Sequence, residues 1–164
     1  MACRHSPVPA PGDRLSLPPR IKVLEALGSI ADGRVRKVGE NIARVTSSTG
    51  DRKYLVYVDP EKRVAYSDDN GTKYRGYIGY PIIAMLMIEG ALPYDERIAK
   101  ALAGIPWKKL NARFKRYAIV ERIVKREALQ RGVKPKEIDS FIRKVMDRLS
   151  TLNLRYSEPP PLPL

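Results

Sequence analysis

Hydrophobic positions change their spacing along the chain, and each spacing indicates a different kind of element. Near the start they recur every three or four residues, which predicts a helix that ends at Gly33 and buries Ile21, Leu24, Leu27 and Ala31. Over residues 34–78, β-branched and aromatic residues alternate with polar ones, as in strands with one buried face. Turn-forming sequences at residues 49–51, 59–62 and 69–71 divide this region, so we expect a small antiparallel β-meander.

Helical patterns return after residue 79. Pro81 opens an uninterrupted apolar stretch, which predicts a helix buried on all sides. Asp95 is placed to cap a short helix, and one long helix is expected from Pro106 to about Arg131. Pro135 begins the last helix, whose apolar residues form a single stripe made of Ile138, Phe141, Ile142, Val145, Leu149 and Leu152.

Together these elements predict an α+β fold, with a small antiparallel β-meander, a buried central helix and a C-terminal helical layer. A chain of 164 residues is long enough for one domain and hardly for two, and we place that domain at residues 20–155. The segments 1–19 and 156–164 are rich in proline, which favours solvated, extended chain. We expect both to be tails and the first to be disordered.

The charge balance favours a polyanionic partner. Lys and Arg number 31 against 18 Asp and Glu, which leaves a formal net charge of +13. The single cysteine and the single histidine, Cys3 and His5, leave no disulfide framework, no cysteine–histidine zinc cage and no histidine-based triad. We therefore expect nucleic acid as the ligand and neither a metal nor another cofactor.

Location and source are constrained only by composition. The longest apolar run, residues 81–88, is far shorter than a membrane span, and the proline-rich start does not resemble a secretory signal. We expect no membrane association and a cytoplasmic protein, with association to the nucleoid compatible with its charge. Charged residues make up 30% of the chain while amides are few, a balance typical of a heat-adapted organism.

Residues 42–87 combine a strand pair, an Arg-Gly step and an apolar helix in the sequence IARVTSSTGDRKYLVYVDPEKRVAYSDDNGTKYRGYIGYPIIAMLM. This arrangement resembles the SWIM-type zinc finger, a ββα module in which C-x-C and C-x-H pairs hold the metal. The four ligand positions fall here on residues that would not form that site: Tyr66, Asp68, Gly79 and Pro81. The resemblance implies a degenerate, zinc-free module with a helical extension over residues 95–153.

In such a module, apolar packing would replace the stabilisation that zinc provides, and Tyr66, Ile78 and Tyr80 are the residues expected to supply it. The resemblance also implies binding to DNA or to proteins, because SWIM modules occur in transposases, chromatin-remodelling ATPases and recombination mediators. Convergence is the alternative, since any hairpin followed by a proline-initiated buried helix has a similar pattern.

The positive charge is concentrated in residues 107–131, which carry two acidic side chains and nine basic ones: Lys108, Lys109, Arg113, Lys115, Arg116, Arg122, Lys125, Arg126 and Arg131. On one continuous helix, Lys108, Lys115, Arg122 and Arg126 would share a face opposite the apolar stripe. Such a row can neutralise backbone phosphates and release counterions. The alternative is a solvated face that is basic for solubility.

A second candidate surface is the segment Lys73-Tyr74-Arg75-Gly76-Tyr77, in which cations alternate with aromatic rings. On a strand it could stack on bases, or the tyrosines could simply pack on the sheet. Trp107 is a further aromatic candidate, but a single tryptophan at a helix start is more often part of the core.

Enzymatic chemistry has little support in the sequence. Asp68 and Asp69 form the one acidic cluster that resembles a magnesium site, and turn formation explains them more simply. We expect no enzyme, the alternative being a magnesium-dependent nuclease that uses this pair. The expected function is largely sequence-nonspecific nucleic-acid binding, with DNA favoured over RNA. The second hypothesis is an adaptor for a recombination or chromatin-remodelling ATPase that docks through the sheet and Ile119 and Ile123. The oligomeric state stays open.

Overall fold

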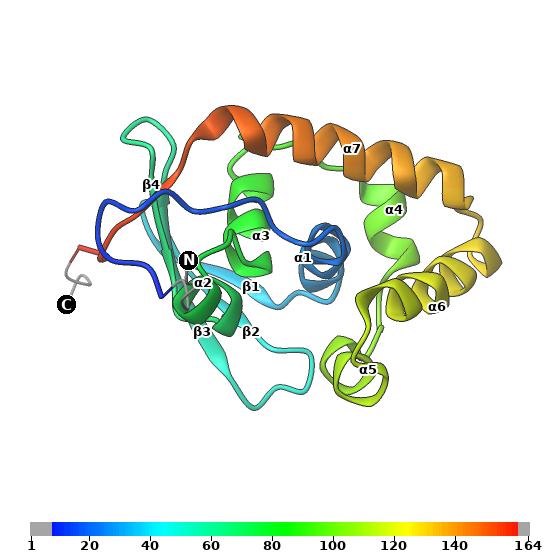
Figure 1. Cartoon of the computed structure of the whole chain (residues 1–164). Helices are drawn as coiled ribbons and strands as arrows, with labels where there is room; N and C mark the ends of the chain where they lie inside the picture. Colours follow the sequence, from blue (N-terminus) through cyan, green and yellow to red (C-terminus); the bar gives the residue numbers. More distant parts are fainter. Residues whose placement is uncertain (1–7, 161–164) are drawn as a thin grey trace, which may run out of the picture.

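The computed structural model describes residues 8–160 and has the predicted α+β architecture (Figure 1). Cys3 and His5 lie outside these residues. In chain order the elements are α1 (Ile21–Ala31), β1 (Val35–Gly39), β2 (Ile42–Thr46), β3 (Lys53–Asp59), β4 (Val64–Ser67), α2 (Asn70–Arg75), α3 (Tyr80–Ile88), α4 (Glu96–Ala101), α5 (Trp107–Phe114), α6 (Tyr117–Gln130), α7 (Pro135–Leu152) and β5 (Arg155–Tyr156).

The sheet has the order β1-β2-β3-β4-β5, and its first four strands form the predicted antiparallel meander. The register pairs Val45 with Tyr54 and Tyr57 with Tyr66. The two-residue strand β5 was not predicted, because a strand this short has no periodicity. It pairs in parallel with β4, opposite Val64 and Ala65, and so brings the end of the chain to the sheet edge.

Helix α3 forms the centre of the core. It packs between α1 and strands β3 and β4 (Figure 1), and every residue from Pro81 to Met87 is buried. This confirms the prediction of a helix without a polar face. Its capping also follows from sequence, since Gly79 precedes the helix in an extended conformation and Pro81 occupies its first turn.

The C-terminal helices cover the other side of α1. As predicted, Asp95 caps α4, with its carboxylate accepting a 3.0 Å hydrogen bond from the Ile98 N–H. Five of the six predicted stripe residues of α7 are buried, and Leu152 is half-buried. Helix α7 packs against α6 and α1 and runs along one side of the molecule (Figure 1).

The single helix predicted from Pro106 to Arg131 is wrong, because the structure has two helices there. Lys115 ends α5 with a φ of 59°, in the left-handed region, and α6 begins at Tyr117. On one straight helix, the side chains of Trp107 and Val120 would point in directions that differ by more than a third of a turn around the helix axis. The break lets both side chains reach the core, where each is buried. Neither glycine nor proline marks it in the sequence.

The expected tails are wrong over part of their length. The Leu15 N–H donates to the Leu154 carbonyl at 2.9 Å, and the Leu15 side chain is buried. Ser16 forms a bridge with Tyr77, and the Ser157 N–H donates to the Ala65 carbonyl. Residues 10–19 and 156–157 therefore belong to the domain, since distant backbone groups supply the hydrogen bonds that a proline-rich segment cannot form locally. Residues 1–7 and 161–164 lie outside the described part.

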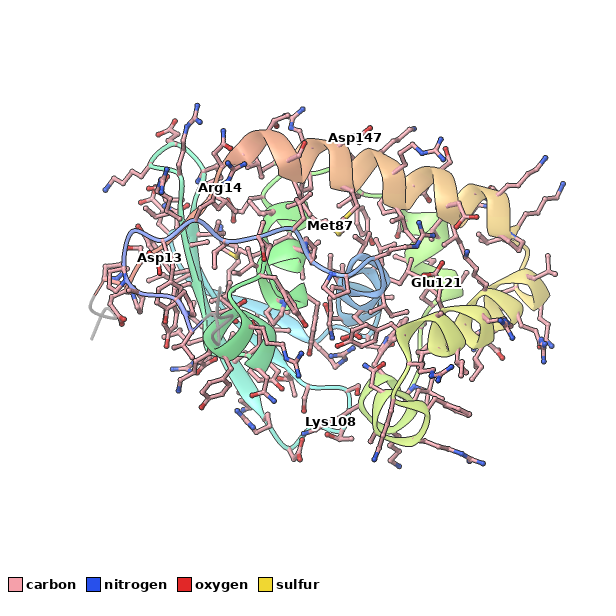
Figure 2. The ribbon with its side chains drawn as sticks, in the orientation of Figure 1. Asp13, Arg14, Met87, Lys108, Glu121 and Asp147 are labelled. Atoms are coloured by element: carbon pink, nitrogen blue, oxygen red, sulfur yellow. The ribbon has the colours of Figure 1, made fainter. Side chains whose placement is uncertain are left out.

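An ion-pair network joins the start of α1 to α6 and α7. The Arg20 guanidinium contacts Glu121 at 2.8 Å and Asp139 at 2.6 Å, and the Lys125 ammonium contacts the same two carboxylates at 2.8 and 2.6 Å. Figure 2 shows Glu121 on the side of α6 that faces α1 and α7. Hydrogen bonding from Lys125 lowers the pKa of Asp139. Burial acts to raise the pKa of Glu121, but hydrogen bonds from Arg20 and Lys125 outweigh it, so that pKa is lowered too.

This network predicts a pH-dependent stability. A carboxylate whose pKa is lower in the folded state stabilises that state above its unfolded pKa, about 4.3 for Glu, and loses this contribution as the pH falls. We expect Glu121→Gln to reduce the free energy of unfolding by about 1 kcal/mol at pH 7 and by less at pH 3. Urea denaturation at pH 7, 5 and 3 measures this difference. A difference that stays constant with pH would contradict the assignment.

Candidate functional site

Three of the nine predicted basic residues on α5 and α6 are engaged with carboxylates. The Lys108 ammonium lies 3.1 Å from Asp51 in the β2–β3 loop. Figure 2 shows Lys108 at the edge of the molecule, beside α5. Lys125 belongs to the network described above, and Arg131 pairs with Glu127 at 3.0 Å. The predicted common face of Lys108, Lys115, Arg122 and Arg126 is therefore wrong, because the helix break separates these residues and Lys108 is paired.

The other six basic residues are exposed and form no ion pair within residues 8–160. We call them the α5–α6 cations: Lys109, Arg113, Lys115, Arg116, Arg122 and Arg126. Lys109 and Arg113 are four residues apart on α5, as are Arg122 and Arg126 on α6, so each pair shares one side of its helix. On α6 that side lies opposite the buried residues Val120, Val124 and Ala128. These charges face solvent, and no carboxylate of the described part of the chain pairs with them.

The second predicted surface has a different structure from the one expected. Lys73, Tyr74 and Arg75 lie in the short helix α2, so the predicted strand is wrong here. The Asp-Asn-Gly sequence that indicated a turn instead begins this helix, with the Asp69 carboxylate accepting from the Thr72 N–H at 3.2 Å. A six-residue helix is too short to show a period. Tyr74 is 51% exposed, and the Lys73 ammonium lies 5.5 Å from the centre of its ring.

A polar cavity of about 280 Å³ lies between α1, the β2–β3 region, α2 and the α5–α6 junction. Four tyrosines and four basic residues are distributed over the lining. The lining residues are Lys22, Glu25, Arg34, Ser47, Ser48, Tyr54, Asp69, Asn70, Gly71, Arg75, Tyr77, Tyr80, Trp107, Lys108, Asn111 and Tyr117. Most were not predicted as site residues, because they come together only through the fold.

The inner part of this cavity contains an ion pair. The Lys22 ammonium lies 3.2 Å from the buried Glu25 carboxylate, which also accepts a 2.9 Å hydrogen bond from the Asn111 side-chain amide. Burial opposes the charged form of Lys22, but Glu25 outweighs it, and the pKa of Lys22 is raised. The ammonium also lies 5.0 Å from the centre of the Tyr117 ring. The helical spacing of Ile21, Leu24 and Glu25 could have identified Glu25, an acidic residue on an apolar face.

Four buried side-chain polar atoms in the described residues have no hydrogen-bond partner, and all four belong to the lining of this cavity. They are Arg34 Nε, Asp69 Oδ1, Trp107 Nε1 and Asn111 Oδ1. Burial raises the pKa of Asp69. Trp107 is buried, as predicted, and it is also the single tryptophan of the chain.

Three glycines shape the walls by leaving space for cavity side chains. A Cβ atom at Gly28 would lie 2.6 Å from the Trp107 indole nitrogen, and one at Gly71 would lie within 2.7 Å of the Tyr77 ring. A Cβ atom at Gly79 would overlap the Asp69 carboxylate. A side chain at any of these three positions would collide with a lining residue. Each glycine therefore leaves the space that one lining side chain occupies.

The acidic pair considered as a magnesium site has structural partners instead. Asp68 Oδ1 accepts from the Leu55 N–H at 2.9 Å, and Asp69 caps α2. Within the described chain, no three His, Cys, Asp or Glu side chains cluster as metal ligands do. At two of the SWIM ligand positions the structure has other contacts. The Tyr66 ring packs on the Tyr156 ring, with 5.7 Å between the ring centroids, and Gly79 lies against the Asp69 carboxylate.

A family model described as "Uncharacterised conserved protein UCP014422" matches residues 15–155. This match covers most of the chain, and the protein belongs to that family. Neither the curated proteins nor the solved structures include a significant match. No helix within residues 8–160 combines the length and apolar character needed to cross a bilayer.

Proposed function

We propose that this protein binds nucleic acid through the α5–α6 cations, largely without regard to sequence. The observation that carries the proposal is that six exposed basic side chains lie on α5, on α6 and at the junction between these helices, and that none is paired with a carboxylate of residues 8–160. Cations in this state attract phosphates and release counterions on contact. Phosphate contacts fix position but carry no base information, hence the lack of sequence preference.

Two further features support this function. The whole chain has a net charge of +13, so the ion pairs within it leave a large excess of positive charge. The resemblance of residues 42–87 to SWIM modules favours DNA as the first candidate and RNA as the second. Strands β3 and β4 precede α3, in the ββα order of that module, with α2 inserted between the strands and the helix.

A second candidate function is that of an adaptor for a recombination or chromatin-remodelling ATPase. Leu129 on α6 is 51% exposed, and Ile119 and Ile123 on the same helix are half-buried. An apolar partner surface could cover these side chains. In that case the positive charge would serve solubility alone.

Salt dependence distinguishes the two functions. We expect the full chain to bind a fluorescein-labelled oligonucleotide with a dissociation constant of roughly 1–100 μM at physiological salt, and the logarithm of its affinity to fall linearly with the logarithm of the salt concentration. Fluorescence anisotropy at several potassium chloride concentrations measures both quantities. An affinity that does not respond to salt would reject phosphate-led binding, and absence of binding at low salt would do the same.

A further inference from the structure

The polar cavity has features of a ligand site that packing alone does not explain. Buried polar groups in folded proteins nearly always have hydrogen-bond partners, and each exception carries a cost. Here the four atoms without a hydrogen bond in the described residues all belong to residues that line one cavity, and one of them, Arg34 Nε, lies 3.6 Å from the Asp32 carboxylate in an ion pair. Asp69 and Trp107, which carry two of them, are 6% and 2% exposed. These atoms are buried behind the cavity surface, so an entering ligand would bond to them after small movements of the lining side chains.

The chemistry of the lining selects the class of ligand. Arg34 and Trp107 offer donors, whereas Asp69 and Asn111 offer acceptors. A simple anion is disfavoured by the Glu25 and Asp69 carboxylates, and a simple cation by Lys22 and Arg34. A planar group that carries both donors and acceptors on its edge satisfies both sides, and nucleobases have this property.

The aromatic and cationic residues of the lining also suit a nucleotide. Tyr54, Tyr77 and Tyr80 line the same space, and aromatic rings stack on any base. Arg75 and Lys108 are both exposed while also lining the cavity, so they stand where it meets solvent. A phosphate attached to an inserted base would lie near Arg75, which forms no ion pair within residues 8–160, whereas Lys108 is paired with Asp51.

We propose that the cavity holds one unpaired nucleotide of a bound single strand, with the base inside and its phosphate beside Arg75. This inference rests on the proposed nucleic-acid binding and adds the strand state of the ligand. The same helices serve both sites, because Lys108, Asn111 and Tyr117 line the cavity while Lys109, Arg113 and Arg116 carry free charge. A base inside a duplex cannot reach such a cavity, since it must first leave the stack.

Trp107 provides a direct probe, because it lines the cavity and no other tryptophan contributes to the emission. The full chain would be titrated with a single-stranded DNA oligonucleotide, with an abasic strand of equal length, with the corresponding blunt duplex and with deoxynucleoside monophosphates. Anisotropy of labelled strands gives the affinity, and tryptophan emission reports occupancy of the cavity. We expect the normal single strand to change the emission and to bind about tenfold more tightly than the abasic strand.

One variant tests the rim of the cavity and a second tests its interior. Arg75→Ala removes an exposed side chain, so folding should be preserved, and it should weaken binding of the normal strand more than binding of the abasic strand. The matched control is Arg148→Ala, an exposed arginine on α7 outside the cavity. Asn111→Leu should abolish the preference for the normal strand, with circular dichroism as the folding check.

The outcomes separate this inference from the function on which it rests. Equal affinity for normal, abasic and duplex DNA, with tryptophan emission unchanged, would overturn the cavity proposal and leave salt-dependent binding intact. Emission changes with free monophosphates but no binding of any oligonucleotide would overturn both and identify a free-nucleotide site. Failure of every probe to bind would also overturn both.

Discussion

Replacing Arg122 and Arg126 by glutamate is expected to weaken binding of a labelled oligonucleotide on the order of 10- to 100-fold at about 0.1 M salt. Both side chains are exposed, one turn apart on α6, opposite its buried face. A 10- to 100-fold loss corresponds to about 1.4–2.8 kcal/mol, or about 0.7–1.4 kcal/mol for each of the two exposed contacts, which is the net value typical of one hydrogen bond. Anisotropy titrations of the variant and the wild type measure it.

The matched control is the double variant Lys144→Glu, Arg148→Glu on α7. These residues are also exposed, also four apart and change the net charge by the same amount. If affinity depended on net charge alone, the two double variants would lose it equally. We expect a several-fold smaller loss in the α7 variant. Equal losses would contradict the assignment of the site to α5 and α6.

Replacing Leu86 by alanine is expected to cost about 2–5 kcal/mol of unfolding free energy, a large part of the roughly 5–15 kcal/mol typical of a domain. Leu86 is fully buried in α3, which lies between α1 and the sheet, so its removal leaves a cavity that neither layer can easily fill. The corresponding fall in melting temperature is roughly 4–20 °C. Urea and thermal denaturation measure both values.

Ile88 on the same helix is the control for that variant. It is 40% exposed, so Ile88→Ala removes less buried surface and should cost less than about 1.5 kcal/mol. A similar cost for the two substitutions would mean that α3 is not the centre of the core. A small cost for Leu86→Ala would mean the same.

Local signals predicted most of the fold. Alternation over residues 34–78 indicated the meander, which in the structure ends at Ser67 because α2 follows. The apolar stripe indicated α7, and the apolar run indicated α3. Each depends on a pattern that a single segment carries. Caps such as Asp95 were predictable for the same reason.

Features that depend on distant segments were missed. Pairing of Leu15 with Leu154 and of β4 with β5 places parts of both expected tails in the domain, which local composition does not indicate. The break at Lys115 results from the need of α5 and α6 to bury different sides, and no breaker residue announces it. The polar cavity is the extreme case, because its lining residues are spread between positions 22 and 117 and come together only in the folded chain.

Part of the predicted site could be identified from sequence, because the exposure of a side chain depends on local pattern whereas its ion pairing does not. Exposure of a basic residue on a helix follows from the helical period, and so Lys109, Arg113, Arg122 and Arg126 are solvent-facing. Whether a basic residue forms an ion pair depends on where distant carboxylates lie in the fold. Asp51 pairs with Lys108, and Asp139 pairs with Lys125. Charge counting along the chain could not separate these groups.

The central claim is that the α5–α6 cations contact phosphates directly. The salt dependence of affinity for single-stranded DNA, compared between the wild type and the Arg122→Glu, Arg126→Glu variant, counts those contacts. Each lost contact reduces the slope by about 0.7 on single strands, so the account predicts a slope smaller by about 1.4 in the variant. Parallel lines with the same slope would contradict it.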